Sequence, residues 1–142
     1  MLAICWADRI VVDHIGFAMA PGEQPTTAGF IGQMPIAVDL DTGDDGTLYL
    51  RPETRTRLLA AGLLQTSGDG VTLRTLSLGG AAFADLPLRL VEAGGAQDVR
   101  PYPGSDFLRL GAQFFAQHPS LWNFPAGTFT VLRSDAGFLK RR

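Results

Sequence analysis

Seventeen glycines and nine prolines divide this 142-residue chain into short segments. Most of these segments alternate apolar and polar residues, or are rich in β-branched and aromatic residues, as strands are. The pattern predicts a first strand over residues 3–12, a hairpin over 26–41 that turns at Gly32 and Gln33, and a closing hairpin over 121–133. We therefore expect a mainly β protein.

Helix signals are few. A helix is predicted to begin at Pro52, which suits a first turn, with Glu53 beside it. It is predicted to end before Gly62, which suits a left-handed C-cap. A second, shorter helix is expected after Gly111, within the segment "GAQFFAQH". The chain is thus predicted to have one or two short helices on a β framework.

Composition sets the limits on class and partners. A chain of this length that is 46% hydrophobic suits one compact domain over residues 1–142. The formal charge of −2 provides no basic patch, so nucleic acid is not an expected partner. The longest uncharged stretch, residues 24–38, is broken by glycine and proline and is too short to span a bilayer. We expect a soluble protein without a clear signal peptide; the compartment is unknown, with the cytoplasm favoured.

The stretch "VDLDTGDDGTL" at residues 38–48 carries four carboxylates. One interpretation is a calcium loop of the EF-hand type starting at Asp39. Such a loop needs an oxygen ligand at its fifth position, glycine at its sixth and glutamate at its twelfth. The sequence has Gly43, Asp44 and Leu50 there, so calcium is disfavoured.

A second interpretation is phosphoryl transfer. "VDLD…GTL" is similar to the strand-end signature of haloacid dehalogenase phosphatases, but extra residues separate its second carboxylate from "GTL". That family also needs a doubly wound parallel sheet with many crossover helices, which this chain does not offer.

A third interpretation is a pair of carboxylates that share one proton, one acting as base toward water and the other as acid toward a carbonyl. Such a site needs an aspartate on a tight turn after a buried strand, followed by a small hydroxyl residue and a glycine. "LDTG" at residues 40–43 supplies this arrangement.

The wider context resembles the retropepsin-like aspartic peptidases. "FIGQMPIAVDLDTGDDGTLYLRPETRTRLLAAGL" is similar to their order of hairpin, apolar strand, Asp-Thr-Gly and proline-started helix. "LRTLSLGGAAFADLPLRLVEA", "FLRLGAQFF" and "LWNFPAGTFTVL" are similar to the later strands, the apolar-apolar-Gly motif and the closing hairpin. The resemblance covers about residues 26–133 and implies a closed β barrel.

The resemblance also implies roles for individual residues. Asp41 is the implied catalytic carboxylate, Thr42 bonds across the axis that relates two active-site loops, and Gly43 lets the substrate backbone pass. Asp45 and Gly111 are implied in substrate binding, Gly111 lying under the catalytic loop. The implied protein is a homodimeric aspartic endopeptidase acting on peptides or proteins, with no metal or organic cofactor.

Three features depart from the family pattern. Asp44 follows Asp-Thr-Gly where a small residue is usual, and Asp39 projects from the same strand face as Asp41. The simplest interpretation places Asp39 and Asp44 on a solvated rim; bonding of Asp39 to an arginine is the alternative. In the family, a glycine-tipped hairpin called the flap closes over the substrate. Between Leu64 and Leu78 the sequence suffices for one strand and a turn, so this flap is predicted to be short or missing. These departures leave open a catalytically silent peptide-binding or dimerisation module.

Overall fold

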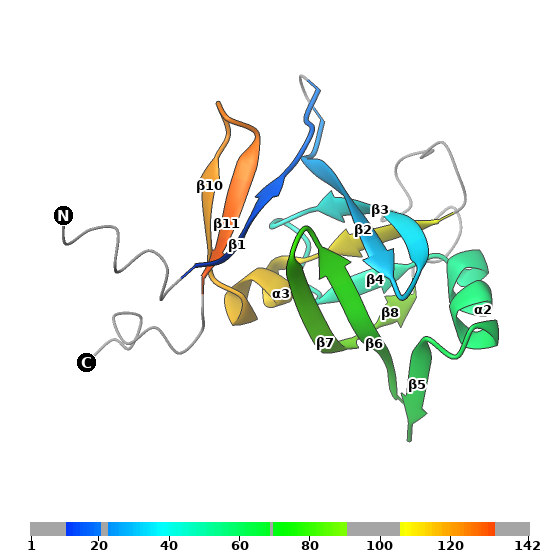
Figure 1. The fold of residues 1–142 in the computed structure, drawn as a ribbon. Helices are drawn as coiled ribbons and strands as arrows, with labels where there is room; N and C mark the ends of the chain where they lie inside the picture. The colour runs from blue at the N-terminus through cyan, green and yellow to red at the C-terminus, as the bar shows by residue number, and fades with distance from the viewer. Residues whose placement is uncertain (1–10, 21–22, 69, 91–105, 133–142) are drawn as a thin grey trace, which may run out of the picture.

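The computed structural model describes residues 11–20, 23–68, 70–90 and 106–132. Two short helices and a series of strands make up this part of the chain (Figure 1). In chain order they are β1 Val11–Gly16, β2 Thr26–Ile31, β3 Met34–Leu40, β4 Leu48–Leu50, α2 Pro52–Ala60, β5 Leu64–Ser67, β6 Gly70–Leu78, β7 Ala81–Pro87, β8 Arg89–Leu90, β9 Phe107–Leu110, α3 Ala112–Gln117, β10 Ser120–Asn123 and β11 Thr128–Leu132.

The strands form two sheets. The smaller has the order β1-β11-β10, and the larger has the order β5-β6-β2-β3-β9-β4-β8, with β7 paired to β6. The larger sheet curls around its core, while the smaller one lies to one side of it (Figure 1). The prediction of a mainly β fold is confirmed. Among the described strands β5 and β8 end the path without pairing to each other, so a closed barrel is not shown.

Both predicted hairpins are present. β2 and β3 pair from Thr26↔Asp39 to Ile31↔Met34, and Gly32 makes the turn at φ 60°. β10 and β11 pair in the same antiparallel way, with Gly127 at φ 60°. A positive φ is inexpensive only for glycine, which is why the turns stand at these positions. Of the predicted first strand, only the part from Val11 lies within the described residues.

The segment between Leu64 and Leu78 corrects one prediction. In place of a single strand and a turn, it forms two antiparallel strands, β5 and β6, paired from Leu64↔Leu73 to Ser67↔Gly70. The hairpin is short because β5 has four residues. The predicted helices are confirmed as α2 and α3, and Gly62 follows α2 at φ 68°.

The centre of the larger sheet is the parallel pair β3 and β9. Asp39 lies beside Arg109 and Leu40 beside Leu110, while the other side of β9 pairs with β4 so that Tyr49 is opposite Arg109. Cross-strand neighbours share a face of the sheet, so Asp39, Arg109 and Tyr49 form one polar row. All three are buried. The ends of β3 and β9 are thereby brought to the same place.

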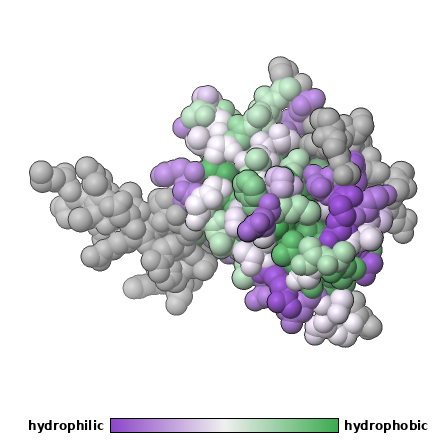
Figure 2. Space-filling model, turned by 45° about the vertical axis from the view of Figure 1, so that its right-hand side comes forward, coloured by the Kyte–Doolittle hydropathy of each residue, from purple (hydrophilic) through white to green (hydrophobic). Residues whose placement is uncertain are grey.

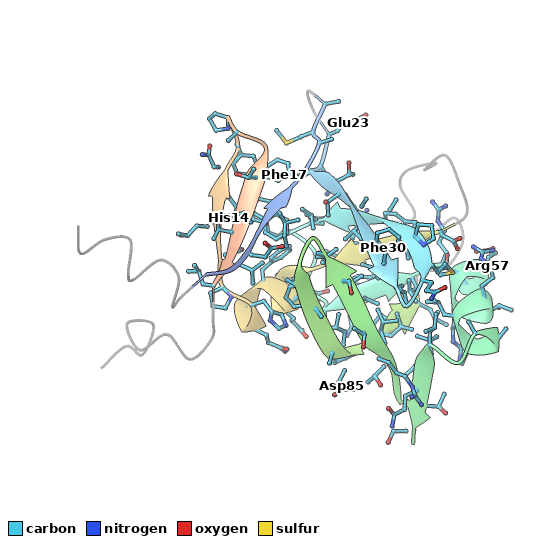
Figure 3. All side chains as sticks on the ribbon, in the orientation of Figure 1. His14, Phe17, Glu23, Phe30, Arg57 and Asp85 are labelled. Atoms are coloured by element: carbon cyan, nitrogen blue, oxygen red, sulfur yellow. The ribbon has the colours of Figure 1, made fainter. Side chains whose placement is uncertain are left out.

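Aromatic rings join the smaller sheet to α3. Phe17, at the end of β1, lies 5.6 Å from Trp122 between ring centroids, and Trp122 stacks on Phe129 at 5.0 Å (Figure 3). Phe115 of α3 completes the group at 5.4 Å from Trp122. Such pairs stabilise a fold beyond the area that they bury. Phe124, by contrast, is half exposed beside this group.

Apolar and polar side chains are interspersed over the face shown in Figure 2. The large hydrophobic residues with substantial exposure include Phe30, Leu121 and Phe124. Within the described residues there is no helix with the length and apolar character needed to cross a membrane.

Candidate functional site

Asp41 follows directly after β3, where the chain leaves the sheet. Its backbone N–H donates to the carbonyl of Leu110 at 2.9 Å, which fixes the loop to the end of β9. The N–H of Gly43 donates to Asp41 Oδ1 at 3.0 Å. The side chain is 17% exposed, so the carboxylate is partly accessible to a reactant.

The other oxygen of Asp41 has two donors nearby. The Gln24 side-chain amide donates to Oδ2 at 2.6 Å, and Arg109 Nε lies 3.7 Å from the same atom. Together with Gly43, these groups hold the carboxylate by both oxygens.

Arg109 is the centre of a charged group that we call the Asp41 cluster: Asp39, Asp41, Asp44 and Arg109. Its Nε donates to Asp39 Oδ2 at 2.8 Å, and its Nη1 donates to Asp44 Oδ2 at 3.5 Å. Burial alone would lower the pKa of Arg109, but its hydrogen bond to Asp39 and the charges of Asp39, Asp41 and Asp44 outweigh burial, and the pKa is raised. The arginine stays charged.

The predicted solvated rim is wrong for two of these carboxylates. Asp39 is 0% exposed and the side chain of Asp44 is 8% exposed. Both side chains turn inward because Arg109, itself 6% exposed, stands on the neighbouring strand and supplies the charge that burial requires. The alternative of an arginine partner for Asp39 is the one that the structure adopts.

Gly111 lies against the backbone of the loop that carries Asp41. Its N–H donates to the Thr47 carbonyl at 3.1 Å, and the N–H of Ala112 donates to the Asp44 carbonyl at 2.6 Å. A Cβ at Gly111 would stand 2.9 Å from the Asp44 carbonyl oxygen and would overlap the Gly46 carbonyl. Glycine is therefore a packing requirement here, and it allows the two segments to touch.

Asp45 projects outward, with 85% of its side chain exposed. Tyr49 Oη donates to its Oδ1 at 3.1 Å, and Arg89 lies at 3.8 Å. Burial, followed by hydrogen bonds to Asp44 and Asp45, raises the pKa of Tyr49 to about 12. Tyr49 is thus a neutral donor that fastens the outer part of the loop to the sheet.

Thr42 is exposed at the tip of the loop. It borders a mostly apolar cavity of about 270 Å³, whose other lining residues are Pro25, Leu40, Trp122 and Phe124. Thr42 thus opens onto apolar surface contributed by the β10–β11 hairpin.

The structure brings Asp41, Thr42, Gly43, Asp45 and Gly111 into one region, as the sequence predicted, and their roles remain proposals. Sequence reasoning did not identify Gln24, Arg109 or Tyr49. Arg109 had a signal: an arginine within the otherwise apolar "FLRL" requires a buried anion. Gln24 had none. No group of three or more acidic, histidine or cysteine side chains suited to a metal ion occurs among the described residues.

Comparisons with known proteins support the fold. No family model and no curated protein matches the chain. Among solved structures, it is similar to a retropepsin-like aspartic protease from Rickettsia conorii, with a TM-score of 0.53 and 15% identity over 84% of this chain and 89% of that one. It is also similar to the retroviral protease-like domain of Ddi1 from Leishmania major, with a TM-score of 0.47 and 13% identity over 80% and 96% of the two chains. The first likeness shows a retropepsin-like fold.

Gly111→Ala is expected to lower the free energy of unfolding by about 2 kcal/mol, because the added methyl group separates the loop from β9. Gly70→Ala is the matched control, since a Cβ there meets only the Ser67 carbonyl at 3.4 Å. Urea unfolding of both variants checks this. Equal stability of the two variants would contradict the close packing at Gly111.

The raised pKa of Tyr49 predicts a loss of stability at alkaline pH. Because its pKa is raised in the folded state, the unfolded chain ionises first, and stability is lost as pH rises from about 10 to 12. The loss approaches about 2 kcal/mol, and Tyr49→Phe removes this part of the pH dependence. Chemical unfolding of both proteins across this range measures it; parallel curves would show that Tyr49 is not the group responsible.

Proposed function

We propose that this chain is an aspartic endopeptidase that acts as a homodimer, with Asp41 of each chain forming the catalytic pair. The observation that carries the proposal is the carboxylate of Asp41, oriented by the Gly43 N–H and partly open at the end of a buried strand. It stands within a fold similar to that of a retropepsin-like aspartic protease. The expected substrates are extended peptides or unstructured protein segments.

In the proposed reaction, a water molecule is held between the two Asp41 carboxyl groups. The ionised carboxylate takes a proton from the water, and the oxygen of that water attacks the scissile carbonyl carbon. The protonated Asp41 donates a hydrogen bond to the carbonyl oxygen, which gains charge as the tetrahedral intermediate forms. Proton transfer to the leaving nitrogen then releases the two products.

The single Asp-Thr-Gly turn of this sequence supports assembly from two chains, because a catalytic pair needs a second such turn. A pair of identical turns can meet about a two-fold axis, which makes the interface isologous. The cavity beside Thr42 presents apolar surface close to Asp41 in the chain. Leu121 and Phe124 are exposed on the β10–β11 hairpin, which contributes to the wall of this cavity. β11 is the middle strand of its sheet, so β1 and β10 are the two edge strands among the described residues. β10 carries the exposed Leu121, and its outer side offers one edge for pairing.

Asp45 and Gly43 support the substrate side of the proposal. The Asp45 carboxylate is exposed one residue beyond the Asp41 cluster, where it can accept hydrogen bonds from backbone amides of an extended peptide. Gly43 is exposed and carries no side chain, so a peptide backbone can approach the carboxylate closely.

One observation favours the second candidate, a silent peptide-binding or dimerisation module. Gln24 donates to Asp41 Oδ2, one of the two oxygens to which the lytic water would bind. If that bond persists in a dimer, it competes with the lytic water for Oδ2. The peptidase requires the carboxylate to exchange this amide for water, whereas the silent module does not.

Asp41→Asn is expected to lower peptide cleavage by about 1,000-fold or more, because the amide keeps the shape but cannot accept the proton. The measurement is cleavage of a library of unstructured peptides between pH 3 and 8, with and without a chelator. Activity is expected below neutral pH and is expected to be insensitive to the chelator.

The matched control is Asp85→Asn. Asp85 lies on β7 with φ 54°, a conformation that asparagine also tolerates, and its side chain points away from the sheet (Figure 3). Circular dichroism should show both variants folded. Full activity in Asp41→Asn would remove Asp41 from the mechanism.

Mixing tests the shared site. At constant wild-type concentration, a fivefold excess of Asp41→Asn chains is expected to reduce activity to about one sixth, because mixed dimers hold a single ionisable Asp41. An Asp41→Asn chain that also carries Phe124→Glu should suppress less, since charge at the exposed Phe124 opposes pairing. Unchanged activity with the first chain, in a protein that sediments as a monomer, would contradict the dimer.

A further inference from the structure

The Asp41 cluster places three carboxylates around one guanidinium. Asp39 and Arg109 are neighbours on the parallel strands β3 and β9, and Asp44 reaches the same arginine from the loop above. Arg109 Nε also lies 3.7 Å from Asp41 Oδ2. The buried Arg109 therefore contacts the proposed catalytic carboxylate and the acidic residues closest to it in sequence on either side, Asp39 and Asp44.

This charge balance has a chemical consequence for Asp41. Without a cation, Asp39 and Asp44 would both oppose its ionisation, because like charges in a shared site raise the cost of the second negative charge. Arg109 offsets that repulsion from within the sheet. Asp45 of the loop and Arg89 of β8 are exposed and lie 3.8 Å from each other, so their charges largely compensate one another.

We propose that Arg109 is a positioning residue that holds the Asp41 carboxylate in place and sets the pH range in which the site works. This rests on the proposed function, since the pH range is that of peptide cleavage. In this role Arg109 makes an acidic residue directly after Asp-Thr-Gly compatible with the site, and Asp39 keeps the guanidinium oriented.

Geometry favours arginine over lysine for this role. Arg109 Nε lies close to the carboxylates of Asp39 and Asp41, and Nη1 lies close to that of Asp44. The planar guanidinium thus contacts three carboxylates at once. A lysine ammonium is a single charged point on a flexible stem and cannot reproduce this arrangement. The uncharged amide of Gln24 adds a second donor to Asp41 Oδ2 without changing the charge of the site.

The test uses two variants with opposite expected shifts. Asp39→Leu with Arg109→Leu removes the buried pair and leaves Asp44 beside Asp41 without its cation, so the pH–rate profile should move to higher pH. Asp44→Ala removes a competing negative charge but keeps Arg109, so its profile should move to lower pH. Arg109→Lys keeps the positive charge but loses the planar guanidinium, so its pH–rate profile should lie between those of the wild type and the double variant.

A structural role alone predicts a different outcome. If Arg109 only supports the fold, the variants lose activity equally at all pH values and the profiles keep their positions, which would overturn the proposal. If the double variant does not fold, Asp44→Ala and Arg109→Lys still decide, because an unmoved profile in both contradicts an electrostatic role.

A second measurement needs no activity. In protein labelled with ¹³C at the aspartate carboxyl carbons, the Asp41 resonance is assigned by its loss in Asp41→Asn, and its titration midpoint is followed in each variant. Midpoints that move in the expected directions in a protein without peptidase activity would uphold the role of Arg109 and contradict the proposed function. Unmoved midpoints in an active peptidase would contradict the role of Arg109 and uphold the proposed function.

Discussion

The contact between Asp39 and Arg109 is the constraint on which the site is built. Both side chains are buried, and they join β3 to β9 at the level where the Asp41 loop begins. A buried ion pair gains little stability over well-packed apolar residues, because desolvation of two charges offsets their attraction. Asp39 Oδ1 is buried and has no hydrogen-bond partner among the described residues, which adds to that cost. The pair is thus better explained by what it holds in place than by stability.

The pair contacts Asp41 and Asp44 of a loop that other bonds also join to the sheet. Backbone bonds from Asp41 to Leu110 and from Ala112 to Asp44 join the loop to the segment around Gly111, and they require backbone contact that only glycine permits. Tyr49 fastens the outer end through Asp45. The orientation of Asp41 therefore follows from three strands, β3, β9 and β4, each of which contributes one buried polar side chain to the same row.

The sequence predicted the parts that depend on local rules. Gly32 and Gly127 mark the two hairpins because those turns need a positive φ, and Pro52 and Gly62 bracket α2 for the same kind of local reason. The aspartate turn after a buried strand could also be predicted from local pattern, whereas the place of Gly111 beneath it was implied only by the family resemblance. The inward direction of Asp39 and Asp44 was not, because it depends on an arginine about 70 residues away in sequence. Gln24 reaches Asp41 only through the path of the chain before β2, which no local pattern reveals. The closed barrel expected from the resemblance is likewise a matter of long-range pairing.

Two-fold symmetry adds a last constraint to the proposed reaction. In a homodimer, each Asp41 meets the same donors: the N–H of Gly43, the amide of Gln24 and the guanidinium of Arg109. These contacts are the same in both chains, so the protein itself cannot decide which Asp41 carries the shared proton. An asymmetric peptide can, because only one carboxyl group faces the carbonyl oxygen that accepts a hydrogen bond. The division of the pair into acid and base would therefore arise on substrate binding, from a site whose two halves are identical and in which Arg109 partly offsets the charge of three carboxylates.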